Sequence, residues 1–237
     1  MRARERRTRI RRLCAHGELE TVFQPMIDLG SDDRIAYEAL TRFPGQSRTT
    51  RECFADATEL GVGAELELAA VRSALGHLPD FPPGTRLSIN VSPAVAITDA
   101  FFELVAPVAE RLIVELTEHE PVDDYDTLVE VLANLRSLGA LIAIDDVGAG
   151  FATLRHIIRL SPDILKLDLS LTHTVESDSG SRALTSALVD FAEHTGTVIT
   201  AEGIETEGEL ELLRELGVDH GQGYFLGRPE RLMAHLQ

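Results

Sequence analysis

The chain has 237 residues, 44% of them hydrophobic, which is enough for one sizeable core and suits an α/β barrel of about 250 residues. Its formal net charge of −17 argues against broad nucleic-acid binding, because such a body repels a phosphate backbone. No apolar stretch approaches the roughly 20 residues that cross a bilayer. Cys14 and Cys53 stand in no metal or redox spacing, so we expect a cytoplasmic protein with reduced thiols.

Arginine is concentrated at the start of the chain. Seven of the 22 basic residues lie within the first twelve positions, so the remainder is still more acidic. Such a segment is typical of a solvated helix or of a linker to an upstream domain, and an anchor for RNA or acidic lipid is the alternative. We therefore divide the chain into an N-terminal helix or linker, residues 1–17, and one domain, residues 18–237.

Short strand-like segments alternate with longer helix-like segments along the rest of the chain. The expected strands are residues 21–29, 34–43, 86–91, 111–116, 140–145, 163–167, 197–201 and 218–221. Apolar residues recur at helical spacing between 125 and 138, where Gly139 gives a stop signal, and further helices are expected over 181–195 and 206–216.

The connections between these strands indicate the fold class. From residue 86 onward a helix follows each strand, as in right-handed parallel crossovers, and the strands are apolar on both faces. The first two strands are joined by a turn at residues 30–33, which is too short for a parallel crossover. The sequence therefore predicts a modified TIM (β/α)8 barrel with one antiparallel strand.

Acidic or amide side chains stand at the ends of the second to the seventh strand, where the loops of an α/β barrel converge. They are Glu38, Asn90, Glu115, Asp145, Asp146, Asp168 and Glu202. Any single one is more typical of a helix cap or a solvated loop. Together they would raise one another's pKa unless cations lay between them, and their oxygen donors favour Mg²⁺ or Mn²⁺ over Zn²⁺.

Lys166 is the one lysine among the 22 basic residues. It lies in the sixth strand on the same face as Asp168, two positions later. Two ions about 4 Å apart can promote an in-line phosphoryl displacement, and a lysine beside them can orient water or stabilise the developing charge. The alternative is a strand-end lysine that reaches solvent. Gly148 and Gly150 make the segment after the fifth strand a candidate mobile lid.

Ordered motifs over about residues 18–233 resemble the EAL family of cyclic di-GMP phosphodiesterases. The matching motifs are Phe23-Gln24-Pro25, Glu38-Ala39-Leu40 with Arg42, Asn90-Val91-Ser92, Glu115-Leu116-Thr117-Glu118, Asp145-Asp146 with its glycine loop, Lys166-Leu167-Asp168, Ala201-Glu202-Gly203-Ile204-Glu205 and Gly221-Gln222-Gly223-Tyr224.

The resemblance implies hydrolysis of cyclic di-GMP to linear pGpG with two divalent cations, Mg²⁺ or Mn²⁺. The metal ligands implied are Glu38, Asn90, Glu115, Asp145, Asp146 and Glu202, the last directly or through water. The catalytic or water-positioning groups implied are Lys166, Glu202 and Gln222. The substrate contacts implied are Gln24, Glu38, Leu40, Arg42, Asn90, Asp168 and Gln222. Glu118 and Glu205 would brace the loop after the fifth strand, which couples the metals to a dimer interface, so a homodimer is expected.

Two residues depart from the family pattern. Val147 stands where a phenylalanine is common, and Phe151 stands where a tyrosine is common. Both lie in the coupling loop, so they bear on turnover rate and dimer coupling rather than on the reaction. Two other functions stay open: a catalytically weak or inactive module that binds cyclic di-GMP or a protein partner, and a barrel enzyme for another phosphodiester. An upstream regulatory domain or partner protein would supply the signal.

Overall fold

The computed structural model describes residues 3–16, 19–45, 48–117, 124–148 and 154–232. Eight strands follow one another around a closed barrel in chain order, and this confirms the predicted fold class. The strands are β1 (Glu20–Asp28), β2 (Arg34–Arg42), β3 (Arg86–Val91), β4 (Leu112–Leu116), β5 (Leu141–Val147), β6 (Ile164–Leu167), β7 (Val198–Ala201) and β8 (His220–Gly221).

One strand runs against the others. β1 pairs antiparallel with both β2 and β8, whereas all other neighbouring strands pair in parallel. The turn between β1 and β2 is held by Asp28 Oδ1, which accepts the backbone N–H groups of Gly30 at 2.9 Å and Ser31 at 2.8 Å. The reversed direction of β1 is the consequence expected of so short a connection.

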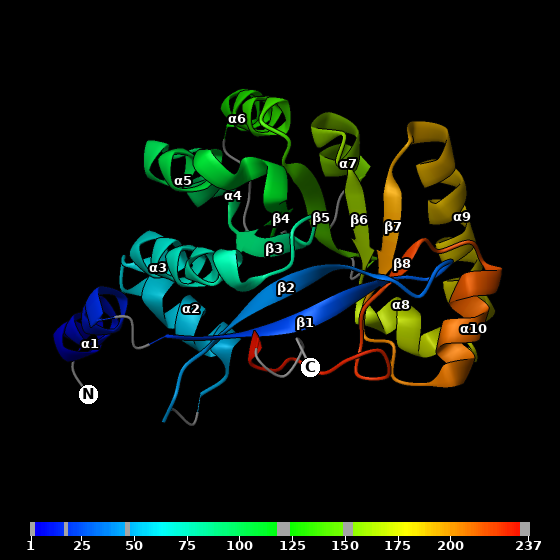
Figure 1. The fold of residues 1–237 in the computed structure, drawn as a ribbon, viewed down its shortest axis with the longest axis horizontal. Helices are drawn as coiled ribbons and strands as arrows, with labels where there is room; N and C mark the ends of the chain where they lie inside the picture. The colour runs from blue at the N-terminus through cyan, green and yellow to red at the C-terminus, as the bar shows by residue number, and fades with distance from the viewer. Residues whose placement is uncertain (1–2, 17–18, 46–47, 118–123, 149–153, 233–237) are drawn as a thin grey trace.

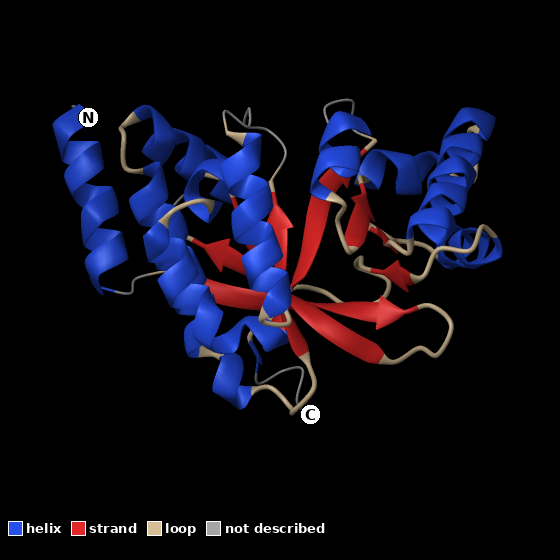
Figure 2. Cartoon of the chain, turned by 90° about the horizontal axis from the view of Figure 1, so that it is seen from above, coloured by secondary structure: helices blue, strands red, loops and turns tan. Residues whose placement is uncertain are grey.

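Helices lie along the outside of most of the strands (Figure 2). They are α1 (Ala3–His16), α2 (Thr50–Glu59), α3 (Gly63–Gly76), α4 (Pro93–Ala96), α5 (Asp99–Val105), α6 (Tyr125–Ser137), α7 (Leu154–Leu160), α8 (Leu169–Thr174), α9 (Ser179–Thr195) and α10 (Glu207–Glu215). The three helices expected from the sequence are α6, α9 and α10. No helix within the described part of the chain is both long and apolar enough to cross a membrane.

Side-chain caps set where these three helices begin. Asp124 and Asp178 accept the backbone N–H three residues further on, and Thr206 forms a capping box with Glu209. Because the cap itself lies outside the helix, α10 starts one residue after the expected position. The cap at Asp178 lets α9 begin two residues earlier than expected.

The N-terminal arginine-rich segment forms α1, which packs against α3. α1, α2 and α3 lie together at one edge of the molecule, and α9 and α10 lie at the opposite edge (Figure 1). The expected boundary between residues 17 and 18 falls outside the described residues, so the division of the chain stays a prediction.

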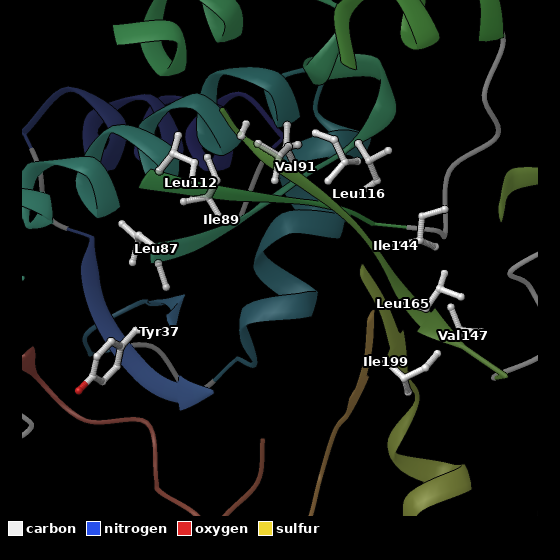
Figure 3. Close-up of a cluster of buried hydrophobic side chains, with 14 of the residues drawn as sticks. Tyr37, Leu87, Ile89, Val91, Leu112, Leu116, Ile144, Val147, Leu165 and Ile199 are labelled. Carbon is white, nitrogen blue, oxygen red and sulfur yellow. The ribbon is translucent and has the colours of Figure 1, made fainter. Parts of the chain in front are cut away.

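The main core lies between the outer face of the barrel and the helices. Leu87, Ile89 and Val91 of β3 are at most 1% exposed and belong to the cluster drawn in Figure 3. Leu128 and Leu132 of α6 are fully buried in the same core. Alternate residues of each strand therefore face outward, and the residues between them face the barrel interior.

The barrel interior has an apolar layer near the start of the parallel strands. That layer consists of Met26, Ala36, Ile113, Ala143 and Ile164. Two positions further along the same strands stand polar residues, since each strand repeats its facing every second residue. Ala36 leads to Glu38, Ile113 to Glu115, Ala143 to Asp145 and Ile164 to Lys166. The fold thus places a polar layer above an apolar floor.

Candidate metal centre and ligand cavity

Lys166 lies at the centre of the polar layer and is fully buried. Its Nζ is 2.7 Å from Glu115 Oε2, 2.6 Å from Glu202 Oε1, 3.4 Å from Asp145 Oδ1 and 3.5 Å from Glu38 Oε2. Four carboxylates, three from separate strands and one from the loop after β7, thus surround one ammonium. The sequence-predicted convergence is present, and the cluster has an excess of negative charge that one lysine does not neutralise. The alternative of a solvent-reaching lysine is wrong.

Hydrogen bonds fix Glu38 in this cluster. Asn90 Nδ2 donates to Glu38 Oε1 at 2.8 Å, and Gln222 Nε2 donates to Glu38 Oε2 at 2.7 Å. Gln222 Nε2 also reaches Gln24 Oε1 at 3.1 Å. The structure therefore brings residues from β1, β2, β3 and the end of β8 into one network, and among the described residues the Oδ1 of Asn90 accepts no hydrogen bond.

A bulge turns Asp146 toward the same site as Asp145. Successive strand residues normally point to opposite faces. Here the register of β5 with β6 shifts between Ile144 and Val147, and Asp146 has a left-handed backbone with φ 55°. As a result, oxygens of Asp145, Asp146 and Glu202 all lie within 4.8 Å of one another, close enough to hold a cation.

The cluster holds its charges unevenly. Burial and the neighbouring Glu38 raise the pKa of Glu115 to about 8, although Lys166 opposes the shift. Burial raises the pKa of Glu202 well above its usual value, and Asp145 adds to the rise against the pull of Lys166. For Glu38, burial is outweighed by Lys166 and by hydrogen bonds from Asn90 and Gln222, so its pKa is lowered.

Lys166 itself stays charged. Burial would lower its pKa, but the carboxylates of Asp145, Glu115, Glu202 and Glu38 raise it well above the usual value. The site without metal therefore retains an ammonium and keeps protons on some of its acids at neutral pH. A divalent cation would replace those protons, since metal ligands bind in their deprotonated form.

Sequence reasoning missed Ser88 as a site residue. Its hydroxyl is fully buried in the barrel and donates to Glu115 Oε1. The signal that would have found it is its position two residues before Asn90 on the same strand face. Ser88 therefore orients the carboxylate whose other oxygen meets Lys166.

A cavity of about 600 Å³ adjoins the cluster, and we call it the ligand cavity. Its volume suits a small organic ligand. Its walls come from β2, β3, α2 and α3 and include Leu40, Arg42, Thr50, Arg51, Phe54, Ala55, Thr58, Glu67, Asn90 and Ser92. Asn90 belongs to both the cavity wall and the polar cluster, so a ligand in the cavity lies next to the carboxylates.

The remaining predicted site residues form no hydrogen bond or ion pair with the cluster among the described residues, or fall outside them. Asp168 caps α8, with its Oδ1 accepting the backbone N–H of Ser170 at 3.0 Å, because β6 ends at Leu167. Glu205 is exposed, and its own backbone N–H donates to Glu209 at 2.7 Å. Their roles stay predictions. Glu118, Gly150 and Phe151 fall outside the described residues.

Val147, the departure that the structure does describe, is buried in the outer core (Figure 3). The bulge at Asp146 separates it from the site, so its side chain contacts hydrophobic residues between barrel and helices.

An α/β barrel with carboxylates gathered at the C-terminal ends of its strands belongs to a class that uses this end for ligands and metals. The chain is a member of the EAL domain family, whose model matches residues 7–229. Among curated proteins it is 30% identical over 241 residues to the uncharacterized protein y4lL of Sinorhizobium fredii, covering 97% of this chain and 29% of that protein. It is 28% identical over 231 residues to the probable cyclic di-GMP phosphodiesterase PdeB of Escherichia coli, covering 92% and 43%.

Two solved structures share the fold over most of this chain. The PaMucR phosphodiesterase in complex with c-di-GMP matches with a TM-score of 0.84 and 25% identity, covering 98% of this chain and 99% of that one. BlrP1 of Klebsiella pneumoniae, in a manganese and c-di-GMP complex, matches with a TM-score of 0.79 and 28% identity, covering 90% and 56%. The chain thus spans less than half of the two curated relatives named above and nearly all of the PaMucR chain in the solved structure.

Proposed function

We propose that this chain hydrolyses cyclic di-GMP to linear pGpG in a metal-dependent reaction. The observation that carries the proposal is the position of the acid cluster around Lys166 directly beside the ligand cavity. Cyclic di-GMP is a dianion that an acidic protein repels, and local cations would offset that repulsion. The names of the PdeB, PaMucR and BlrP1 matches support the choice of substrate.

The residues present fit two divalent cations, Mg²⁺ or Mn²⁺. Glu38, Asn90, Glu115, Asp145, Asp146 and Glu202 would hold them through oxygen atoms. Asp145 Oδ1 is buried and accepts no hydrogen bond among the described residues, although it lies 3.4 Å from Lys166 Nζ, so it has capacity for a cation. When bound, the metals would activate water and stabilise the leaving oxygen of a phosphodiester. The manganese in the BlrP1 complex supports this assignment.

The chain's own residues would orient the substrate and the attacking water. Arg42 lines the cavity and can bind a phosphate with two parallel hydrogen bonds. Leu40, from the same strand face, offers an apolar contact to a base. Lys166 keeps its ammonium among the carboxylates, where it can hold a water and stabilise charge on the phosphorus centre. Gln222 Oε1 is buried without a hydrogen bond among the described residues, so it can accept one from water or substrate.

The wider setting of the reaction is also part of the proposal. We infer a cytoplasmic homodimer in which Glu118 and Glu205 brace the loop after β5 and couple it to the dimer interface. A regulatory domain or partner protein would supply the signal that this coupling transmits.

The test is a turnover assay on the purified chain with Mn²⁺ and cyclic di-GMP, with products separated by chromatography. We expect linear pGpG from the parent and none from Glu38→Ala or Lys166→Ala, because each removes part of the cluster. Glu65→Ala, an exposed glutamate on α3, is the matched control and should match the parent. Circular dichroism of each variant checks folding. Intact cyclic di-GMP after incubation with the folded parent would defeat the proposal, and measured binding without product would identify a non-catalytic module.

A further inference from the structure

The helix α2 separates the ligand cavity from the N-terminal helix α1. Residues at helical spacing on one face of α2 line the cavity: Thr50, Arg51, Phe54, Ala55 and Thr58. The buried residues of α2 lie on the opposite face: Cys53, Asp56 and Ala57. Because the same 10-residue helix carries both faces, any shift of α2 on its buried side also moves the cavity wall.

Asp56, on the buried face, is bound by two arginines. Its side chain is 7% exposed, and Arg48 Nη1 donates to its Oδ2 at 2.8 Å. Arg6 of α1 donates from Nε to the same oxygen at 3.0 Å and forms an ion pair with Oδ1. Burial of a carboxylate is strongly unfavourable once one of its charged partners is lost. The contact with Arg6 therefore constrains the position of Asp56 and of α2, which carries it.

Apolar burial is limited among the described side chains of α1. Ile10 is the one buried residue among the described side chains of α1, and Leu13 and Cys14 are half-buried. A void of about 80 Å³ lies at this junction, bordered by Arg6 and Ile10 of α1 and by Cys53 of α2. Sparse apolar burial is typical of segments that open at low free energy. The docking of α1 therefore depends on its charged contacts.

A second ion pair joins α1 to a different helix. Arg11 forms a bidentate contact with Glu65 of α3, with the closest atoms 2.7 Å apart. Both side chains are about half exposed, at 50% and 46%, and exposed pairs of this kind contribute little. Arg11 thus provides a comparison on the same helix that does not touch α2.

We propose that Arg6 and Asp56 form a clamp through which the docking of α1 sets the position of α2 and the ligand affinity of the cavity. Arg6 and Asp56 are positioning residues, since neither lines the ligand cavity. A protein or chain segment that binds α1 would then regulate the site without touching it. The identity of the occupant, cyclic di-GMP, rests on the proposed function. Because coupling is reciprocal, a bound ligand must also strengthen the docking of α1.

The experiment compares Arg6→Ala and Asp56→Asn with the control Arg11→Ala in the full chain. Hydrogen exchange without ligand is measured first. We expect faster exchange of the α2 amides in both clamp variants and parent-like exchange of α2 in Arg11→Ala. Asp56→Asn keeps the shape of the side chain, so it provides the test if Arg6→Ala does not fold.

Ligand binding is measured next, by calorimetry in EDTA so that no turnover occurs. We expect the Kd for cyclic di-GMP to rise about fivefold or more in the clamp variants, as is typical of coupled sites, and to stay at the parent value in Arg11→Ala. Affinity for Mn²⁺ alone should be unchanged in all of them, which a general loss of structure would not allow. In the parent, saturating ligand should slow exchange of the α1 amides.

Parent-like exchange of α2 in both clamp variants would overturn the clamp, whatever the ligand. Equal ligand affinity in the parent and in both clamp variants would overturn it as well. A parent that leaves cyclic di-GMP intact in the Mn²⁺ turnover assay would instead refute the proposed function, and the exchange of α2 would still decide whether the clamp exists.

Discussion

At the scale of single residues, the site depends on a buried lysine among four acids. Lys166 contacts carboxylates that come from β2, β4, β5 and the loop after β7, and burial makes each unpaired charge costly. Protonation of Glu115, whose pKa is about 8, relieves part of the excess negative charge. Without metal, the cluster therefore retains unfavourable repulsion between its carboxylates, which a bound cation would reduce.

This arrangement predicts how stability without metal depends on pH. The folded pKa of Glu115 is about 8, above its usual value of 4.5, so folded protein keeps a proton that unfolded protein loses. Between these two values the free energy of unfolding must fall as pH rises, and above about 8 this contribution levels off. Glu115→Gln removes the titration and should flatten that fall. Melting temperatures in EDTA from pH 5 to 8 measure it; equal slopes in parent and variant would contradict the assignment.

The same titration predicts proton release on metal binding. At pH 7, Mn²⁺ should displace the proton of Glu115, and its apparent affinity should rise with pH up to about 8. Calorimetry in buffers of different ionisation enthalpy counts the protons released. A pH-independent affinity without proton release would show that Glu115 is no ligand.

At the scale of elements, the end of β5 decides whether both aspartates reach the site. A regular strand would turn Asp146 away from Asp145, and the left-handed backbone at Asp146 prevents this. Aspartate and asparagine tolerate this conformation better than most side chains do. The backbone form of the bulge and the metal-binding role of the side chain can thus be separated by substitution.

Asp146→Asn should keep the fold and lose metal affinity. Asparagine retains the left-handed conformation but removes the charge. We therefore expect the free energy of unfolding in EDTA to be unchanged and the affinity for Mn²⁺ to fall by roughly tenfold or more. Asp32→Asn is the control, because Asp32 also has a positive φ, 63°, but lies in the turn after β1. Urea unfolding and Mn²⁺ titration provide the two measurements. Parent-like Mn²⁺ affinity in Asp146→Asn would remove Asp146 from the ligand set.

At the scale of the whole molecule, the metal site depends on the closed barrel and on the core that surrounds it. The carboxylates of the cluster come from β2, β4, β5 and the loop after β7, and helices such as α6 cover the outer face of the barrel. Site and core should therefore be lost together in one cooperative transition.

Substitutions on α6 test this dependence. Leu132 is fully buried and Val129 is 40% exposed on the same helix. Leu132→Ala should lower the free energy of unfolding by about 2–5 kcal/mol, whereas Val129→Ala should change it by less than about 0.5 kcal/mol. Urea unfolding followed by circular dichroism and by Mn²⁺ binding should give coincident curves in each variant. Loss of the site at lower urea than loss of helix signal would contradict a single cooperative unit.

The sequence by itself determined the fold class, the strand order and the polar residues that line the barrel interior. These features are local: strand periodicity fixes which side chains share a face, and a short turn fixes the antiparallel start. The tertiary structure decided the rest. The sequence predicted that Glu38 and Lys166, 128 residues apart, share one end of the barrel, but their contact depends on how the closed barrel packs. The bulge at Asp146 departs from the two-residue repeat of a regular strand. The ion pair of Arg6 with Asp56 joins two segments whose relative position no local sequence pattern predicts. Contacts between distant segments depend on the packing of the whole chain, and for that reason they could not be derived from spacing alone.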